Sequence, residues 1–295
     1  MATTSRLTLP RNEALRQLRR PIAPAAPIVK WAGGKTRLLS ELMRRRPLEF
    51  RRYYEPFLGG GALFFKTLPT HAVLSDVNED LMNVYRCIAW NVEAVIRRLE
   101  AHRENHGHDY YYAVRARFND RRNCRSTVER AAAFLYLNKT CFNGLYRVNK
   151  RGMFNVPIGR YAAPRICDPK ALRSASRVLQ RTELRIGNYQ EQLRDAGPGD
   201  FVYIDPPYDP LTKTANFTSY TAGSFGDQDQ HDLACVVGDL TDRGVFVMLS
   251  NSDTPFIRDL YRGFKIEQIM APRAISSKGN MRARVPEVLI TNGYR

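Results

Sequence analysis

Short hydrophobic runs and segments of helical periodicity alternate along most of this chain. Runs of β-branched and aromatic residues have the length of strands, and from about residue 78 to residue 143 apolar residues recur at helical spacing. This alternation is typical of an open α/β sheet. It predicts strands at 52–55, 72–76, 183–187, 201–204, 245–249, 265–269 and 287–291, and helices at 36–46, 63–67, 170–180, 230–243 and 255–262.

Polar stretches interrupt this pattern at three places. Ser250-Asn251-Ser252 follows a predicted strand and indicates a turn. Residues 209–229 carry few helix or strand signals, and loops of that length are often functional lids. Residues 273–284 form a basic loop rich in Ser and Gly, which suits contact with phosphate groups.

The predicted strand 201–204 stops at Asp205-Pro206-Pro207-Tyr208. Prolines cannot continue a central strand, so Asp205 and Tyr208 are expected at its carboxyl end, where open α/β sheets bind ligands. A carboxylate and a freed backbone carbonyl can accept both hydrogens of an exocyclic amine, and an aromatic ring can stack on the base. The alternative is a Pro-rich turn with a capping Asp.

A first glycine turn, Gly33-Gly34-Lys35-Thr36, opens a predicted helix. The P-loop pattern requires a glycine five residues before Gly34, and Val29 stands there, so the turn is not a P-loop. A helix start of this kind can hold a carboxylate or another anion. A simple structural turn is the alternative.

A second glycine turn, Gly59-Gly60-Gly61, follows a short predicted strand, and Asp76 ends the next strand. A glycine loop after one strand and an acid at the end of the next is the arrangement that grips a ribose. It predicts a cofactor that contains adenosine. Asp76 could instead cap the helix that follows it.

Residues 141–161 predict a β-hairpin, because Lys150-Arg151-Gly152 separates two β-rich runs. Basic and aromatic side chains alternate along it, as in elements that read a nucleic-acid groove. An ordinary surface hairpin is the alternative. The residues concerned are Phe142, Tyr146, Arg147, Lys150, Arg151, Arg160 and Tyr161.

Charge is the feature of the composition that indicates a class of partner. The 295 residues include 46 Lys and Arg against 29 Asp and Glu, a net charge of +17 that favours a polyanionic partner. The five cysteines are scattered without a Cys-x-x-Cys pair, which argues against a zinc site and fits a reducing compartment, so we expect no metal. No run of apolar residues reaches membrane-spanning length, so we expect no membrane partner.

Several of these segments together resemble the Dam-like DNA adenine-N6 methyltransferases. The resemblance covers nearly all of residues 28–292 and leaves out the basic tail, residues 1–27. Residues 214–218 and 275–277 are similar to the subgroup that methylates adenine in GATC. The matching segments, in the family's order, are 30–35, 55–61, 75–78, 143–157 and 205–208.

The resemblance implies an S-adenosylmethionine-dependent, Rossmann-like α/β fold: a mixed, mostly parallel sheet with helices on both faces. Residues 28–77 and 170–295 would form the catalytic domain, and residues 78–169 would form a helical and β-hairpin target-recognition insert. S-Adenosylmethionine would be the methyl donor. Its implied contacts are Trp31, Ala32, Gly33, Gly34, Lys35, Phe57, Gly59, Gly61, Asp76 and Asp205.

The resemblance also assigns the remaining site residues. The catalytic motif would be Asp205, Pro206, Pro207 and Tyr208. Phe142 stands where we associate a tyrosine with the most similar relatives. The implied DNA contacts are Phe142, Asn143, Leu145, Arg147, Asn149, Lys150, Arg151, Pro157, Tyr161, Ser276, Lys278 and Arg282.

The expected function is therefore site-specific methylation of a flipped adenine in double-stranded GATC, by a monomer in the cytoplasm. Two alternatives remain from the residues. One is the same chemistry on RNA or on a protein glutamine, and the other is a catalytically inactive DNA-binding homologue.

Overall fold

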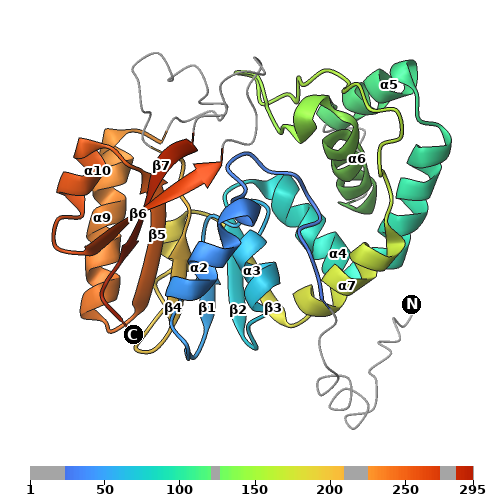
Figure 1. Ribbon diagram of the computed structural model, residues 1–295. Coiled ribbons are helices and arrows are strands. Elements are labelled where there is room, and N and C mark those ends of the chain that lie inside the picture. The colour runs from blue at the N-terminus through green and yellow to red at the C-terminus, as the bar shows by residue number, and fades with distance from the viewer. Residues whose placement is uncertain (1–23, 121–126, 209–224, 273–283, 295) are drawn as a thin grey trace, which may run out of the picture.

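The computed structural model describes residues 24–120, 127–208, 225–272 and 284–294, and within them it has one seven-stranded sheet (Figure 1). The order across the sheet is β3-β2-β1-β4-β5-β7-β6. Strands β3 to β5 in that order are parallel, and β7 runs antiparallel to both β5 and β6. The strands are β1 (Tyr53–Glu55), β2 (Ala72–Asp76), β3 (Thr182–Ile186), β4 (Phe201–Ile204), β5 (Phe246–Ser252), β6 (Lys265–Pro272) and β7 (Arg284–Thr291).

Helices cover both faces of the sheet, as the strand pattern requires. Successive residues of a strand point to opposite faces, so Tyr53 packs with one buried cluster and Tyr54 with the other. The first cluster includes α2 (Leu39–Arg45), α3 (Ala62–Thr67) and α7 (Pro169–Leu179). The second includes α8 (Tyr189–Gln192), α9 (Asp227–Asp242) and α10 (Pro255–Leu260). The mixed α/β fold expected from the sequence is confirmed.

Three helices follow β2 where the sequence shows one long helical pattern. They are α4 (Glu79–Glu104), α5 (His108–Asn119) and α6 (Thr127–Thr140), and Figure 1 shows α5 and α6 to one side of the sheet. Asn91 has a non-helical backbone and bends α4. Buried side chains of α4, α5 and α6 belong to the same apolar cluster as β1 and β4, so this segment and the sheet share one core.

Several boundaries differ from the predictions. Ser250, Asn251 and Ser252 do not form a turn, because they are buried inside β5 and pair with β7. The helix expected at 36–46 begins as a 3₁₀ turn, η1 (Lys35–Leu38), and α8 had no clear signal. Strands β6 and β7 extend beyond the runs 265–269 and 287–291. Most of the predicted lid, 209–224, and of the phosphate loop, 273–283, lies outside the described residues.

The prediction of a two-stranded β-hairpin at residues 141–161 is wrong. The chain does turn back on itself there, but its pairing consists of two isolated antiparallel bridges, Cys141 with Ile158 and Val148 with Phe154. A 3₁₀ turn, η2 (Phe142–Gly144), precedes the reversal. We call residues 141–161 the 141–161 loop. Side chains of α5 and α6 donate or accept hydrogen bonds with the backbone of this loop, in place of a regular strand ladder.

Across the described residues, no helix has the length and apolar content needed to cross a membrane.

Candidate active site

Asp205 lies immediately after β4, at the carboxyl edge of the sheet, where a lysine approaches it. The Nζ of Lys35 lies 2.8 Å from Asp205 Oδ1 and donates a 2.7 Å hydrogen bond to the carbonyl of Gly33. The same Nζ lies 4.5 Å from the centre of the Tyr208 ring. Lys35 thus joins the first glycine turn to the Asp-Pro-Pro-Tyr motif, and the two segments that the sequence singled out separately lie together.

Burial dominates the electrostatics of this centre. It raises the pKa of Asp205, while the adjacent Lys35 ammonium opposes the rise and favours the carboxylate. Burial also raises the pKa of Tyr208 well above its usual value, so the phenol keeps its proton and donates a 2.7 Å hydrogen bond to Glu287 Oε2 on β7. Burial likewise raises the pKa of Glu287. A charge-assisted pair and a fixed aromatic ring therefore face the same site.

Two buried amides hold the Pro206-Pro207 turn in place. Gln230 Nε2 on α9 donates a 3.0 Å hydrogen bond to the carbonyl of Pro207. Asn251 Nδ2 on β5 donates a 3.1 Å bond to Gln230 Oε1. The sequence pattern did not identify Glu287, Gln230 or Asn251 as site residues. The polar run 250–252 at a strand was the one available signal, and we interpreted it as a turn.

The second glycine turn and Asp76 form one unit. Asp76 accepts hydrogen bonds from the backbone N–H of Gly59 at 3.0 Å and of Asn78 at 2.9 Å. Burial raises the pKa of Asp76, and these hydrogen bonds partly oppose the rise. Asn78, rather than Asp76, caps α4, since its side chain accepts from the N–H of Leu81 at 2.9 Å. The alternative role of Asp76 as a helix cap is therefore wrong.

Trp31 lies directly against this turn. Gly59 has a φ of +46°, and a Cβ there would lie 2.6 Å from Trp31 Cδ1, so only glycine fits. Two apolar side chains are exposed at the same edge, Val77 after β2 (65 % exposed) and Ile186 at the end of β3 (37 % exposed). Asp76 and Ile186 are paired in register. A carboxylate flanked by exposed apolar side chains suits a nucleoside. The sequence pattern did not identify Val77 or Ile186.

A second carboxyl group, Glu55, lies buried at the end of β1, next to β4. It is 3 % exposed, and Tyr53 donates a 2.7 Å hydrogen bond to its Oε2. Burial raises the pKa of Glu55 to about 8, and the negative charge of Asp205 acts in the same direction. The sequence placed Glu55 in a matching motif but gave no sign that it is a buried acid.

The segment with Lys30 and Trp31 also touches the 141–161 loop. The Trp31 ring stacks on Tyr146, with 5.3 Å between ring centres. The buried side chain of Asn138 binds both the N–H and the carbonyl of Lys30 at 2.8 Å, and it donates to the carbonyl of Gly144 at 3.1 Å. Gly144 has a φ of +67°, and a Cβ there would collide with the Lys30 side chain. The predicted donor segment and the predicted recognition segment are therefore in direct contact.

The predicted DNA-contacting residues of the loop lie at different depths. Phe142 is 51 % exposed. Arg147 is half-buried, and its Nε donates a 2.7 Å hydrogen bond to Asn155 Oδ1. The side-chain Oδ1 of Asn149 accepts hydrogen bonds from the N–H groups of Arg151 and Met153, so this side chain stabilises the turn. Asn143, Lys150, Arg151, Pro157 and Tyr161 are exposed, Leu145 is half-buried, and Ser276, Lys278 and Arg282 lie outside the described residues.

The sequence of this chain is similar to those of several known proteins. Residues 31–275 match the family model for D12 class N6 adenine-specific DNA methyltransferases. The type II methyltransferase M1.LlaDCHI of Lactococcus lactis is 42 % identical, over 90 % of this chain and 95 % of its own. The type II methyltransferase M.MjaIII of Methanocaldococcus jannaschii is 42 % identical, over 90 % and 98 %. The DNA adenine methylase of Vibrio cholerae is 39 % identical, over 88 % and 94 %.

Proposed function

Since the chain belongs to the D12 class of N6 adenine-specific DNA methyltransferases, we propose that it methylates an adenine rotated out of duplex DNA at the sequence GATC. The observation that carries the assignment of the catalytic centre is the cluster at the end of β4, where Lys35 pairs with Asp205 beside the Tyr208 ring. The choice of GATC rests on the resemblance of residues 214–218 and 275–277 to the GATC subgroup, and on Arg147, which matches the family position that reads the first base.

Residues at the carboxyl edge of the sheet fit the methyl donor that this family implies. Asp76 would accept hydrogen bonds from the ribose hydroxyls of the donor, and Val77 and Ile186 would lie on either side of the donor's own adenine ring. Because Gly59 has no side chain, the turn can pack directly against Trp31, and no larger residue fits at this position. When bound, S-adenosylmethionine supplies a methyl group made electrophilic by its sulfonium.

The target adenine would stack on Tyr208, whose ring is fixed by Glu287 and Lys35. Asp205 and the carbonyl of Pro206 would accept the two hydrogens of the N6 amine, which raises the electron density on nitrogen. Gln230 binds the carbonyl of Pro207 and so holds the turn that presents Pro206. These contacts align the nitrogen, and such alignment accounts for a large part of enzymatic rate gains.

DNA would lie across the 141–161 loop, within a target-recognition segment formed by residues 78–169. Lys150 and Arg151 are exposed at the tip and suit phosphate contacts, which fix register without reading sequence. Arg147 would hold the guanine edge of GATC through two hydrogen bonds. Exposed Phe142 would enter the space that the flipped base leaves. The net charge of +17 favours duplex DNA over a protein substrate.

Transfer of tritiated methyl to a panel of 20-mer duplexes tests this function. The panel holds GATC and its single-base variants, with RNA and a glutamine peptide as further arms. Arg147→Ala should lose discrimination at the guanine by about tenfold or more, as expected for a bidentate base contact. Lys150→Ala, the control, should weaken binding to every duplex alike and reduce the salt slope by about one. Unchanged preference at the guanine in Arg147→Ala, or transfer to RNA or peptide, would overturn the proposal.

A further inference from the structure

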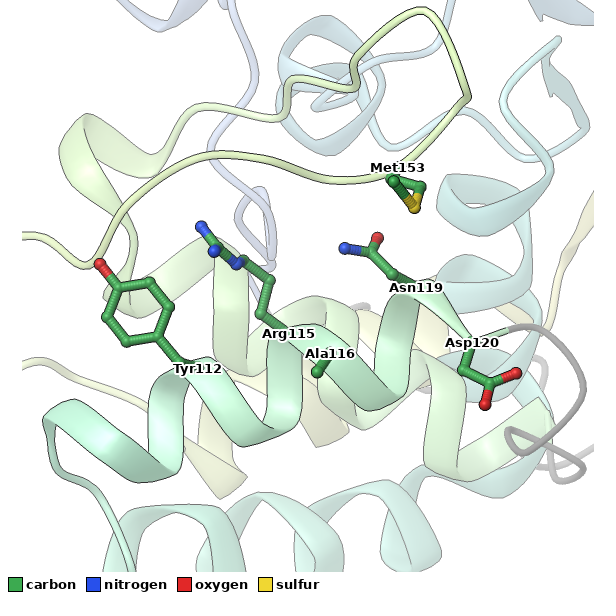
Figure 2. A pocket seen from close by; sticks show the side chains of 6 residues that line it. All are labelled: Tyr112, Arg115, Ala116, Asn119, Asp120 and Met153. Carbon is green, nitrogen blue, oxygen red and sulfur yellow. The ribbon is translucent and has the colours of Figure 1, made fainter.

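One side of α5 holds the returning limb of the 141–161 loop. Tyr111, Arg115 and Asn119 are four residues apart and so share a helix face. The Tyr111 hydroxyl donates to the carbonyl of Val156 at 2.8 Å, and Arg115 donates to the same carbonyl at 3.2 Å. Figure 2 shows Arg115 and Asn119 directed from α5 toward the chain that carries Met153. Beside these side chains lies an open hollow of about 420 Å³, lined by Tyr112, Arg115, Ala116, Asn119, Asp120 and Met153.

Asn119 makes the most specific of these contacts. Its Nδ2 donates to the carbonyl of Phe154 at 2.9 Å, and its Oδ1 accepts from the N–H of Phe154 at 2.8 Å. One side-chain amide thus reproduces the paired hydrogen bonds that a neighbouring strand would give to a single residue. The loop needs such support, because its own pairing is limited to two isolated bridges.

The limb that Asn119 holds is the limb that orients Arg147. Asn155 follows Phe154 directly, and its Oδ1 accepts the 2.7 Å hydrogen bond from Arg147 Nε. The N–H of Asn155 also donates to the carbonyl of Arg147 at 3.1 Å. Phe154 and Val156, the residues on either side of Asn155, are both fixed by α5. The position of the Arg147 guanidinium is therefore coupled to α5 through Asn155.

We propose that Asn119 is a positioning residue for base discrimination: it holds the 154–156 limb so that Arg147 meets its base in one orientation. This inference rests on the proposed role of Arg147. Asn119 contacts neither the donor segment nor Asp205 in the described structure. Its loss should therefore relax sequence preference at one base and leave donor binding unchanged.

The test uses the full chain with three variants. Asn119→Ala removes both bonds to Phe154, and Asn119→Asp keeps the acceptor for the N–H. Asn83→Ala is the matched control, because it removes a side-chain bond to the backbone of Thr127 within the same helical segment but away from the loop. For each variant, kcat/KM is measured on GATC and on every single-base variant, together with donor affinity and amide hydrogen exchange at Phe154.

Asn119→Ala should lose discrimination at the guanine by roughly 5- to 150-fold, the factor that two hydrogen bonds are worth net. Preference at the other three bases and donor affinity should stay at the parent level, Phe154 should exchange faster, and Asn119→Asp should lie between. A uniform fall in activity on all duplexes, or full discrimination at the guanine, would overturn the inference. If Arg147→Ala loses discrimination and Asn119→Ala does not, this inference fails alone. If Arg147→Ala also keeps the parent's discrimination at the guanine, the proposed function fails.

Discussion

Replacing the buried acid Glu55 by glutamine should make the protein less sensitive to rising pH. The pKa of Glu55 is raised from 4.5 to about 8 in the folded state by burial and by the charge of Asp205. A folded pKa above the unfolded one means that the folded state retains a proton that the unfolded state has released. The stabilising contribution of protonated Glu55 is therefore complete below pH 4.5 and is lost as the pH rises to about 8.

The magnitude follows from the shift. Each pH unit between the two values is worth 1.36 kcal/mol of unfolding free energy for one group. Glu55 should thus reduce stability by about 3 kcal/mol at pH 7 relative to pH 4.5, and by about 5 kcal/mol above pH 8. Glutamine fills nearly the same volume, can accept from the Tyr53 hydroxyl as Glu55 does, and does not titrate.

The assay is urea unfolding of the parent and of Glu55→Gln at about pH 5, 7 and 8.5. The difference in unfolding free energy should move by about 4 kcal/mol in favour of Glu55→Gln across that range. Exposed Glu49→Gln serves as the control for removing a carboxyl group. A difference that stays constant within about 0.5 kcal/mol from pH 5 to 8.5 would show that folding does not perturb Glu55 and would refute the reasoning.

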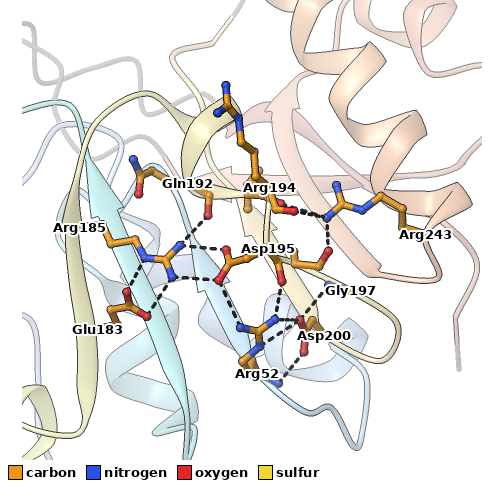
Figure 3. Close-up of polar contacts among 11 residues, drawn as sticks. Arg52, Glu183, Arg185, Gln192, Arg194, Asp195, Gly197, Asp200 and Arg243 are labelled. Carbon is orange, nitrogen blue, oxygen red and sulfur yellow. Dashed lines mark hydrogen bonds and ion pairs between the residues drawn. The ribbon is translucent and has the colours of Figure 1, made fainter.

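Two further predictions follow from buried carboxylates elsewhere. Asp76→Ala should weaken S-adenosylmethionine binding by about 1–3 kcal/mol, measured by calorimetry, because it leaves the ribose hydroxyls and the Gly59 N–H unpaired. The control, exposed Asp109→Ala, should leave the affinity unchanged, and equal affinities for the two variants would contradict the proposed role of Asp76. Fully buried Asp200 accepts from Arg52 and from the N–H of Gly197 (Figure 3), so Asp200→Ala should lower the unfolding free energy by about 2–4 kcal/mol in urea. Asp239→Ala, which removes an exposed partner of Arg243, should cost about 0.5 kcal/mol or less, and similar losses for both variants would count against this account.

Sequence pattern located the parts of the site whose signals are local. The stop of strand β4 at Pro206 and Pro207 placed Asp205 at the carboxyl edge, because proline cannot donate to the ladder. The glycine turn followed by an acid at the end of the next strand likewise placed Asp76, since both features lie within one short stretch of chain. What these patterns could not give is the partner of each polar group.

The missing partners are far away in the sequence. Asn138 binds the backbone of Lys30 across 108 residues, and Gln230 binds Pro207 across 23. Nothing near an amide in the sequence identifies such a partner, because any exposed backbone carbonyl would serve equally well. The prediction of a turn at residues 250–252 was wrong for the same reason: the sequence does not show that their polar side chains have distant hydrogen-bond partners. In the fold their burial is possible because Asn251 reaches Gln230 and Ser250 Oγ reaches the Tyr203 hydroxyl at 3.0 Å.

The order of the strands explains why these distant segments meet. The chain builds β1, β2 and β3 outward in one direction and then returns to place β4 on the other side of β1. The second glycine turn and Asp205 therefore lie on either side of this reversal, which is where open α/β sheets bind ligands. Lys35 reaches Asp205 from the segment before β1, and that segment also contacts the 141–161 loop through Trp31 and Asn138. One short segment thus touches both the proposed catalytic carboxylate and the proposed recognition loop. A substitution in residues 30–35 should therefore change both donor binding and DNA binding, and separate binding measurements distinguish the two effects.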